Sequence, residues 1–197
     1  IFHPENYRTN EGMHVMRLRF LTLLGLLMMT TALPLNAQDD AYTAPRIIGY
    51  FASWKIYGDD PYLVTDVPAE LLTHINYAFA GISEAGEISL LDPWADTQIP
   101  YEGDADDQPL KGNFHQLQLL KQANPHLQTL ISVGGWTESH RFSDAALTPE
   151  SREKFAASVV RFITEYGFDG VDLDWEYPTG GGDPKNVERP ADPENFV

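Results

Sequence analysis

Cysteine is absent from this sequence of 197 residues. Disulfide bonds, thiolate metal sites and cysteine nucleophiles are therefore excluded together, and cysteine usage does not indicate the redox compartment. Basic residues are also scarce, because 13 lysines and arginines face 29 aspartates and glutamates, a formal net charge of −16. Such a charge repels phosphate backbones and anionic membrane surfaces, so we expect no nucleic-acid partner. A neutral or weakly cationic polymer is not excluded.

One long apolar run without charge extends from Phe20 to Leu33 and follows Arg17 and Arg19. The run is shorter than the roughly 20 residues that a membrane-spanning helix needs, which disfavours a permanent anchor. A basic start, an apolar stretch and a small residue at the end are typical of a signal peptide. We therefore predict a signal peptide over residues 13–37, and a secreted or periplasmic protein with no membrane association after cleavage.

Residues 1–12 precede Met13 and Met16, the two methionines at which this signal peptide could begin. We interpret residues 1–12 as a non-native extension from upstream of the true start. After the leader, strand and helix signals alternate over residues 46–197, with no internal repeat.

Four segments rich in β-branched and aromatic residues predict strands. They cover residues 46–54, 74–80, 127–136 and 168–177. A helix capped by Asn113 is predicted through Gln122. The acidic, aperiodic stretch from Asp92 to Gly112 predicts a long loop or a small excursion between the second strand and this helix. Strands that alternate with helices favour an α/β fold with parallel strands and right-handed crossovers.

A second helix is predicted to open at Thr148 and Pro149 and to close at Gly167. Its apolar residues recur at three- and four-residue spacing and form one stripe that should pack on the sheet: Phe155, Val159, Phe162, Ile163 and Tyr166. Each predicted strand ends in a glycine, tryptophan or acidic cluster, where a parallel barrel carries its chemistry.

The fourth predicted strand carries three carboxylates on one face. Because side chains alternate along a strand, Asp172, Asp174 and Glu176 share a face, and the apolar residues between them point to helices on the other. Burying three like charges is unfavourable without shared protons or hydrogen bonds, which favours a functional site over a structural one. A solvated edge strand is one alternative. A calcium or magnesium site is another, although the segment lacks the usual loop carbonyls. Asp169 is interpreted as a supporting turn or cap residue.

This segment, DGVDLDWE at 169–176, resembles the D-x-x-D-x-D-x-E signature of glycoside hydrolase family 18, the chitinase family. Three further segments resemble that family in the same order. They are GYFASWKIYG at 49–58, THINYAFAGI at 73–82 and SVGGW at 132–136. The resemblance implies a (β/α)8 TIM barrel of which this chain holds about the first four strands, so residues 46–197 would be the N-terminal half of the catalytic domain.

The resemblance further implies hydrolysis of β-1,4 bonds between N-acetylglucosamine units of chitin, with retained configuration and without a metal or cofactor. Glu176 would be the general acid, and the substrate's own 2-acetamido oxygen would attack the anomeric carbon. Asp174 would orient the acetamido group, and Asp172 would share a proton with Asp174. Ser132 could hydrogen-bond to the Asp172 side, although an ordinary strand serine is equally compatible with the sequence.

By the same resemblance, Trp136, Tyr50 and Phe79 would bind the sugar rings of chitin or its oligosaccharides, the alternative for each being core packing. The chain ends before the later strands of the family, so we expect the fragment alone to be inactive. Two other functions stay open. One is a chitin-binding lectin on the same barrel, which the presence of Glu176 disfavours. The other is an endo-β-N-acetylglucosaminidase.

Overall fold

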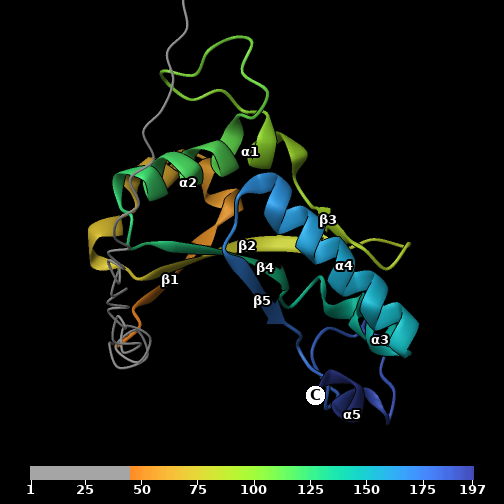
Figure 1. The fold of residues 1–197 in the computed structure, drawn as a ribbon. Coiled ribbons are helices and arrows are strands. Elements are labelled where there is room, and N and C mark those ends of the chain that lie inside the picture. Colours follow the sequence, from red (N-terminus) through yellow and green to blue (C-terminus); the bar gives the residue numbers. More distant parts are fainter. Residues whose placement is uncertain (1–44) are drawn as a thin grey trace, which may run out of the picture. The chain divides into compact units, whose positions relative to one another are not determined.

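The computed structural model describes residues 45–197. The predicted upstream extension and signal peptide lie outside these described residues. The sheet has the strand order β1-β2-β4-β5, and β3 pairs with the C-terminal end of β2 (Figure 1). The strands are β1 (Ile48–Ala52), β2 (His74–Ile82), β3 (Ile88–Leu90), β4 (Gln128–Gly134) and β5 (Gly170–Asp174).

All four predicted strands are present, and they pair in parallel in chain order. Their ends differ from the prediction, because β1 stops at Ala52, where a 3-10 turn (Ser53–Ile56) begins, and β5 stops at Asp174. The short strand β3, which pairs antiparallel with β2, was not predicted. Four parallel strands with helical crossovers form the first half of a (β/α)8 barrel.

α-Helices follow β3, β4 and β5 along the chain, whereas β1 and β2 are joined by 3-10 turns alone. The α-helices are α1 (Pro93–Thr97), α2 (Gly112–Ala123), α3 (Phe142–Ala146), α4 (Pro149–Tyr166) and α5 (Asp192–Phe196), with further 3-10 turns at Val64–Asp66, Ala69–Leu71 and Ser139–Arg141. The prediction for α4 is confirmed at both ends. Thr148 accepts a hydrogen bond from the Ser151 N–H, and Gly167 ends the helix in the left-handed conformation (φ +77°).

One prediction for the segment before β4 was wrong. Asn113 does not cap α2, because the helix begins at Gly112 and the Asn113 side chain is fully buried. The stretch from Asp92 to Gly112 contains the short helix α1, as a small excursion would, and the Asp92 carboxylate caps this helix by accepting a bond from the Ala95 N–H at 3.1 Å. Local caps of this kind need only three residues, which a search for long apolar periods does not detect.

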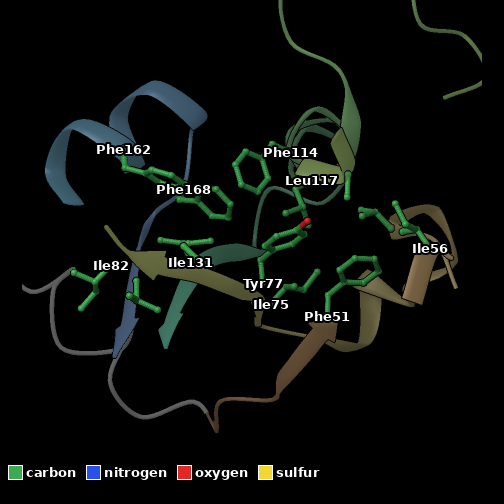
Figure 2. Packing of buried hydrophobic residues seen from close by; sticks show 14 of the residues in the cluster. Phe51, Ile56, Ile75, Tyr77, Ile82, Phe114, Leu117, Ile131, Phe162 and Phe168 are labelled. Atoms are coloured by element: carbon green, nitrogen blue, oxygen red, sulfur yellow. The ribbon is translucent and has the colours of Figure 1, made fainter. Parts of the chain in front are cut away.

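The main core lies between one face of the sheet and the helices α2 and α4 (Figure 2). Tyr77 of β2 meets Phe114 of α2 edge to face, with ring centroids 5.1 Å apart, and Phe114 meets Phe168 at 5.0 Å. Phe162 of the predicted stripe packs against the same cluster. The aromatic contacts fix both helices on this face, which leaves the opposite face of the strands to carry the site.

A buried polar network lies at the edge of this core. The Tyr77 hydroxyl donates to Asp96 Oδ1 at 2.5 Å and accepts from Asn113 Nδ2 at 2.9 Å. Asn113 Oδ1 in turn accepts from the Tyr101 hydroxyl at 2.6 Å. Burial raises the pKa of Asp96 to about 7, and the nearby Asp92 charge adds to the rise, while the Tyr77 hydrogen bond opposes it. The buried carboxyl thus joins β2, α1 and α2.

Candidate active site

The strand register brings the predicted site residues together at the carboxyl ends of the parallel strands. Ser132 of β4 lies opposite Asp172 of β5, and Gly134 lies opposite Asp174. Ala78 of β2 lies opposite Ser132 on the other side. These residues alternate with Ile131 and its neighbours, which face the core helices, so the site occupies the face that a closed barrel turns inward.

Asp172 is held by hydroxyl groups from two other strands. Its Oδ2 accepts from the Tyr50 hydroxyl at 2.8 Å and from Ser132 Oγ at 2.6 Å. Partial burial raises the pKa of Tyr50, and the hydrogen bond to Asp172 raises it further, so the phenol remains a donor. Both bonds reach the same oxygen, which fixes the carboxylate and leaves Oδ1 unengaged by these two donors.

Asp174 lies between the other two carboxylates of the row and is half-buried. Burial raises its pKa, and the charges of Glu176 and then Asp172 raise it further. The direction of this shift means that Asp174 binds a proton more readily than an isolated aspartate in water.

Glu176 lies two residues beyond the end of β5, and its side chain is half-buried. The Glu176 N–H donates to Ser139 Oγ at 2.9 Å, and the Glu176 carbonyl accepts from Asn186 Nδ2 at 2.7 Å. Sequence reasoning missed both Ser139 and Asn186. No local pattern marks them, because they contact the acidic row across sequence separations of 37 and 10 residues.

The apolar residues between the carboxylates behave differently from one another. Trp175 is buried and stacks on Phe142 at 5.3 Å, and Val171 packs against the core. The expectation that Leu173 would also pack beneath helices was wrong, because its side chain is 41% exposed. The reason is its position on β5, which has a strand partner only on its β4 side in the described sheet.

The three predicted sugar-binding aromatics lie on neighbouring parts of the sheet: Tyr50 in the middle of β1, Phe79 in the second half of β2 and Trp136 just after β4. Tyr50 and Trp136 are 60% and 51% exposed, whereas Phe79 is half-buried. Phe79 stacks on Trp54 at 6.1 Å, and Trp54 is itself 54% exposed. Core packing therefore does not account for Tyr50 and Trp136, and Trp54 is an exposed aromatic of this face that sequence reasoning missed.

Two glycines at the end of β4 allow a close approach of the backbone to its neighbours. A Cβ on Gly134, whose φ is +106°, would lie 2.5 Å from the Asp174 carbonyl oxygen. A Cβ on Gly135 would lie 2.9 Å from the Phe79 ring. Only glycine permits this backbone to lie so close to β5 and to the aromatic ring.

Asp169 lies outside the row and joins three elements. Its Oδ2 accepts from the Thr129 N–H of β4 and forms an ion pair with Lys121 of α2, both at 2.7 Å. These contacts agree with its interpretation as a supporting residue.

Within residues 45–197, none of the helices is long and apolar enough to cross a membrane. In the same described part of the chain, no three His, Asp or Glu side chains are grouped so that they could hold a metal ion.

A row of carboxylates at the carboxyl ends of parallel barrel strands, flanked by exposed aromatic rings, defines the class of barrel glycoside hydrolases. The family model of "Glycosyl hydrolases family 18" matches residues 46–197. The chain belongs to this family.

Several known proteins are similar to the chain. Chitinase A1 from Niallia circulans is 44% identical over 191 residues, a match that covers 82% of this chain and 27% of that protein. The structure of chitinase ChiA74 from Bacillus thuringiensis matches with a TM-score of 0.73 at 40% identity, covering 78% of this chain and 31% of that one.

A third similar protein is a mutant of catalytic domain 2 of the Group II chitinase from Ostrinia furnacalis, in complex with penta-N-acetylchitooctaose. It matches with a TM-score of 0.62 at 29% identity and covers 77% of this chain and 37% of that one. The chain thus spans less than two fifths of the length of each of these three proteins.

Proposed function

We propose that the protein is a chitinase, which hydrolyses β-1,4 bonds between N-acetylglucosamine units. Membership of the family supports this proposal, together with the chitinase names of similar proteins and the chito-oligosaccharide in one similar structure. The observation that carries it is the row itself. Glu176 lies two residues after Asp174, at the C-terminal end of the row, and Asp172 is fixed by hydroxyl groups of two other strands.

In the proposed reaction, Glu176 donates its proton to the glycosidic oxygen as the bond from this oxygen to the anomeric carbon breaks. The 2-acetamido oxygen of the same sugar attacks the anomeric carbon, which forms an oxazolinium-like intermediate and releases the sugar leaving group. Water then opens this ring from the same face as the departed sugar, and Glu176 takes its proton. The product therefore keeps the β configuration, and the catalyst returns to its starting state.

Asp174 has the role of orienting the acetamido group in this proposal. It accepts a hydrogen bond from the acetamido N–H, and its charge stabilises the positive charge that develops there. For that, the proton favoured at Asp174 has to pass to Asp172, whose Oδ1 is not engaged by Tyr50 or Ser132. The coupled pair can thus supply the acceptor when the substrate needs it.

Trp136 and Tyr50 supply exposed aromatic surface for the flat apolar faces of the sugar rings, and Phe79 supplies a partly covered third ring. The remaining strands of the barrel complete the cleft in this proposal, so the activity belongs to the protein with a complete barrel and residues 1–197 alone are inactive.

Export is part of the same proposal, because chitin is an extracellular polymer that cannot enter the cell. The signal peptide over residues 13–37 would direct the protein to the periplasm or the medium. Sequencing the N-terminus of the mature protein tests this directly. A terminus at residue 38 supports export, and a mature chain that still carries residues 13–37 contradicts it.

Replacing the acid tests the enzymatic proposal. In the barrel-complete protein, Glu176→Gln should lower turnover of a chitin pentasaccharide by about 10²- to 10⁴-fold, the usual contribution of a general acid. Binding of the pentasaccharide, measured by calorimetry, should survive. Glu165→Gln on the exposed side of α4 is the matched control and should leave turnover unchanged.

Two outcomes would overturn the proposal. Binding without cleavage by the unmodified protein would place it with chitin-binding lectins. Cleavage confined to the N-acetylglucosamine core of glycoproteins would instead make it an endo-β-N-acetylglucosaminidase.

A further inference from the structure

The main chain at Glu176 lies beyond the regular ladder of the sheet. The last backbone bond between β4 and the β5 segment runs from the Gly135 N–H to the Asp174 carbonyl at 2.8 Å. At Glu176 the strand partner is replaced by two side chains, Ser139 on the N–H and Asn186 on the carbonyl. The backbone of the proposed acid is therefore held from both sides by groups that belong to neither strand.

Ser139 connects this backbone to the turn after β4. The side chain is fully buried, and its oxygen lies 2.7 Å from the Gly135 carbonyl and 3.1 Å from the Asp174 carbonyl. Since a hydroxyl has one proton, Ser139 donates towards these carbonyls while it accepts from the Glu176 N–H. One oxygen thus fixes the distance between the glycine turn and the acid.

Asn186 reaches Glu176 from the segment that follows the signature. The segment passes so close that a Cβ on Gly182 would lie 2.1 Å from the Glu176 carbonyl oxygen. Its far end is anchored to α3, because the Arg189 guanidinium donates to Ser143 Oγ and to Asp144 Oδ1, each at 2.7 Å. Asn186 is therefore presented by a segment fixed at both ends.

The contacts of Asn186 fix the orientation of its side-chain amide. Asn186 Oδ1 is buried without a hydrogen-bond partner among the described residues, while Nδ2 donates to the Glu176 carbonyl. An exchange of the amide oxygen and nitrogen would place two oxygens 2.7 Å apart, which excludes the flipped orientation.

We propose that Ser139 and Asn186 are positioning residues that aim the Glu176 carboxyl at the glycosidic oxygen. The inference rests on the proposed function, since it assigns these residues to the acid of that reaction. A general acid must come within hydrogen-bond reach of the atom that it protonates. A misplacement of about 1 Å lowers the rate by about 10²-fold, so loss of either hydrogen bond to the Glu176 backbone should slow the protonation step.

A pair of substrates separates positioning of the acid from general damage to the site. One is a chitin pentasaccharide, whose sugar leaving group needs protonation. The other is the 2,4-dinitrophenyl glycoside of di-N-acetylchitobiose, whose acidic phenol leaves without it. In the barrel-complete protein, Asn186→Ala and Ser139→Ala should lower kcat/KM for the pentasaccharide by about 10- to 100-fold. They should lower kcat/KM for the aryl glycoside much less, because kcat/KM reports only the steps up to bond cleavage and not the later attack of water.

Matched controls exist elsewhere in the chain. Asn124→Ala removes an equivalent amide-to-carbonyl bond of 3.0 Å at the end of α2. Ser158→Ala removes a buried serine that likewise accepts from a backbone N–H and donates to a carbonyl. Neither should change the ratio of the two kcat/KM values. Asn186→Asp, which keeps the side-chain size but loses the donor when ionised, should repeat the selective loss if Asn186→Ala fails to fold.

Equal losses on both substrates in folded variants would overturn the inference, because a merely structural role does not distinguish leaving groups. So would an unchanged kcat/KM on the pentasaccharide. Glu176→Gln, measured on the same pair, keeps the two proposals distinguishable. If it retains full pentasaccharide turnover, the proposed function itself fails. If Glu176→Gln shows the selective loss and neither Ser139→Ala nor Asn186→Ala does, only the positioning inference fails.

Discussion

Ionisation of the buried Asp96 should weaken the fold as the pH rises. Burial raises the pKa of Asp96 from its ordinary value of 3.8 to about 7. The folded protein therefore binds the proton more tightly than the unfolded chain, so the stabilisation is fully present below pH 3.8 and is lost as the pH rises through 7. At about 1.4 kcal/mol per pKa unit, the shift corresponds to roughly 4 kcal/mol across this window.

Asp96→Asn removes the titration and can still accept the Tyr77 hydrogen bond. We expect the free energy of unfolding of the barrel-complete protein, measured by urea titration from pH 4 to pH 8, to fall more steeply than that of the variant. The difference between the two proteins should grow by roughly 4 kcal/mol towards pH 8. Asp107→Asn on the exposed loop is the control and should follow the unmodified protein. Parallel pH profiles for Asp96→Asn and the unmodified protein would refute the reasoning.

Two further substitutions test the site. Tyr50→Phe removes the 2.8 Å bond to Asp172 and keeps the aromatic ring, so kcat on a chitin pentasaccharide should fall about 10-fold while KM changes little. An unchanged kcat in steady-state kinetics would show that this bond does not serve catalysis. Gly134→Ala should lower the melting temperature for two reasons. The φ of +106° costs an alanine about 1–3 kcal/mol of backbone strain, and the alanine Cβ would lie 2.5 Å from the Asp174 carbonyl oxygen. A melting curve that matches the unmodified protein would contradict the close approach of β4 and β5.

Local patterns predicted the elements that position the site. The alternation of charged and apolar residues at 169–176 located β5 and its carboxylates, and the spacing of the α4 stripe located the helix behind it. The prediction that Ser132 could reach Asp172 is confirmed at 2.6 Å, because parallel strands in register place equivalent carboxyl ends together.

Contacts between distant segments could not be predicted in the same way. Asparagine is a common capping residue, yet Asn113 is buried against Tyr77. The reason is that α2 already begins at Gly112, which lies against α1. Ser139 and Asn186 meet Glu176 only after two loops fold over the end of β5. Side chains of this kind are common in any loop, so tertiary packing alone assigns them to the site.

The anomer of the first product tests the central claim most directly. Chitin pentasaccharide should be mixed with the barrel-complete protein, and the new reducing ends followed by proton NMR before mutarotation. Acid catalysis by Glu176 with attack by the 2-acetamido oxygen predicts β-anomer first, and no such signal from Glu176→Gln. Initial release of the α-anomer, or unchanged β-anomer release by Glu176→Gln, would contradict the account.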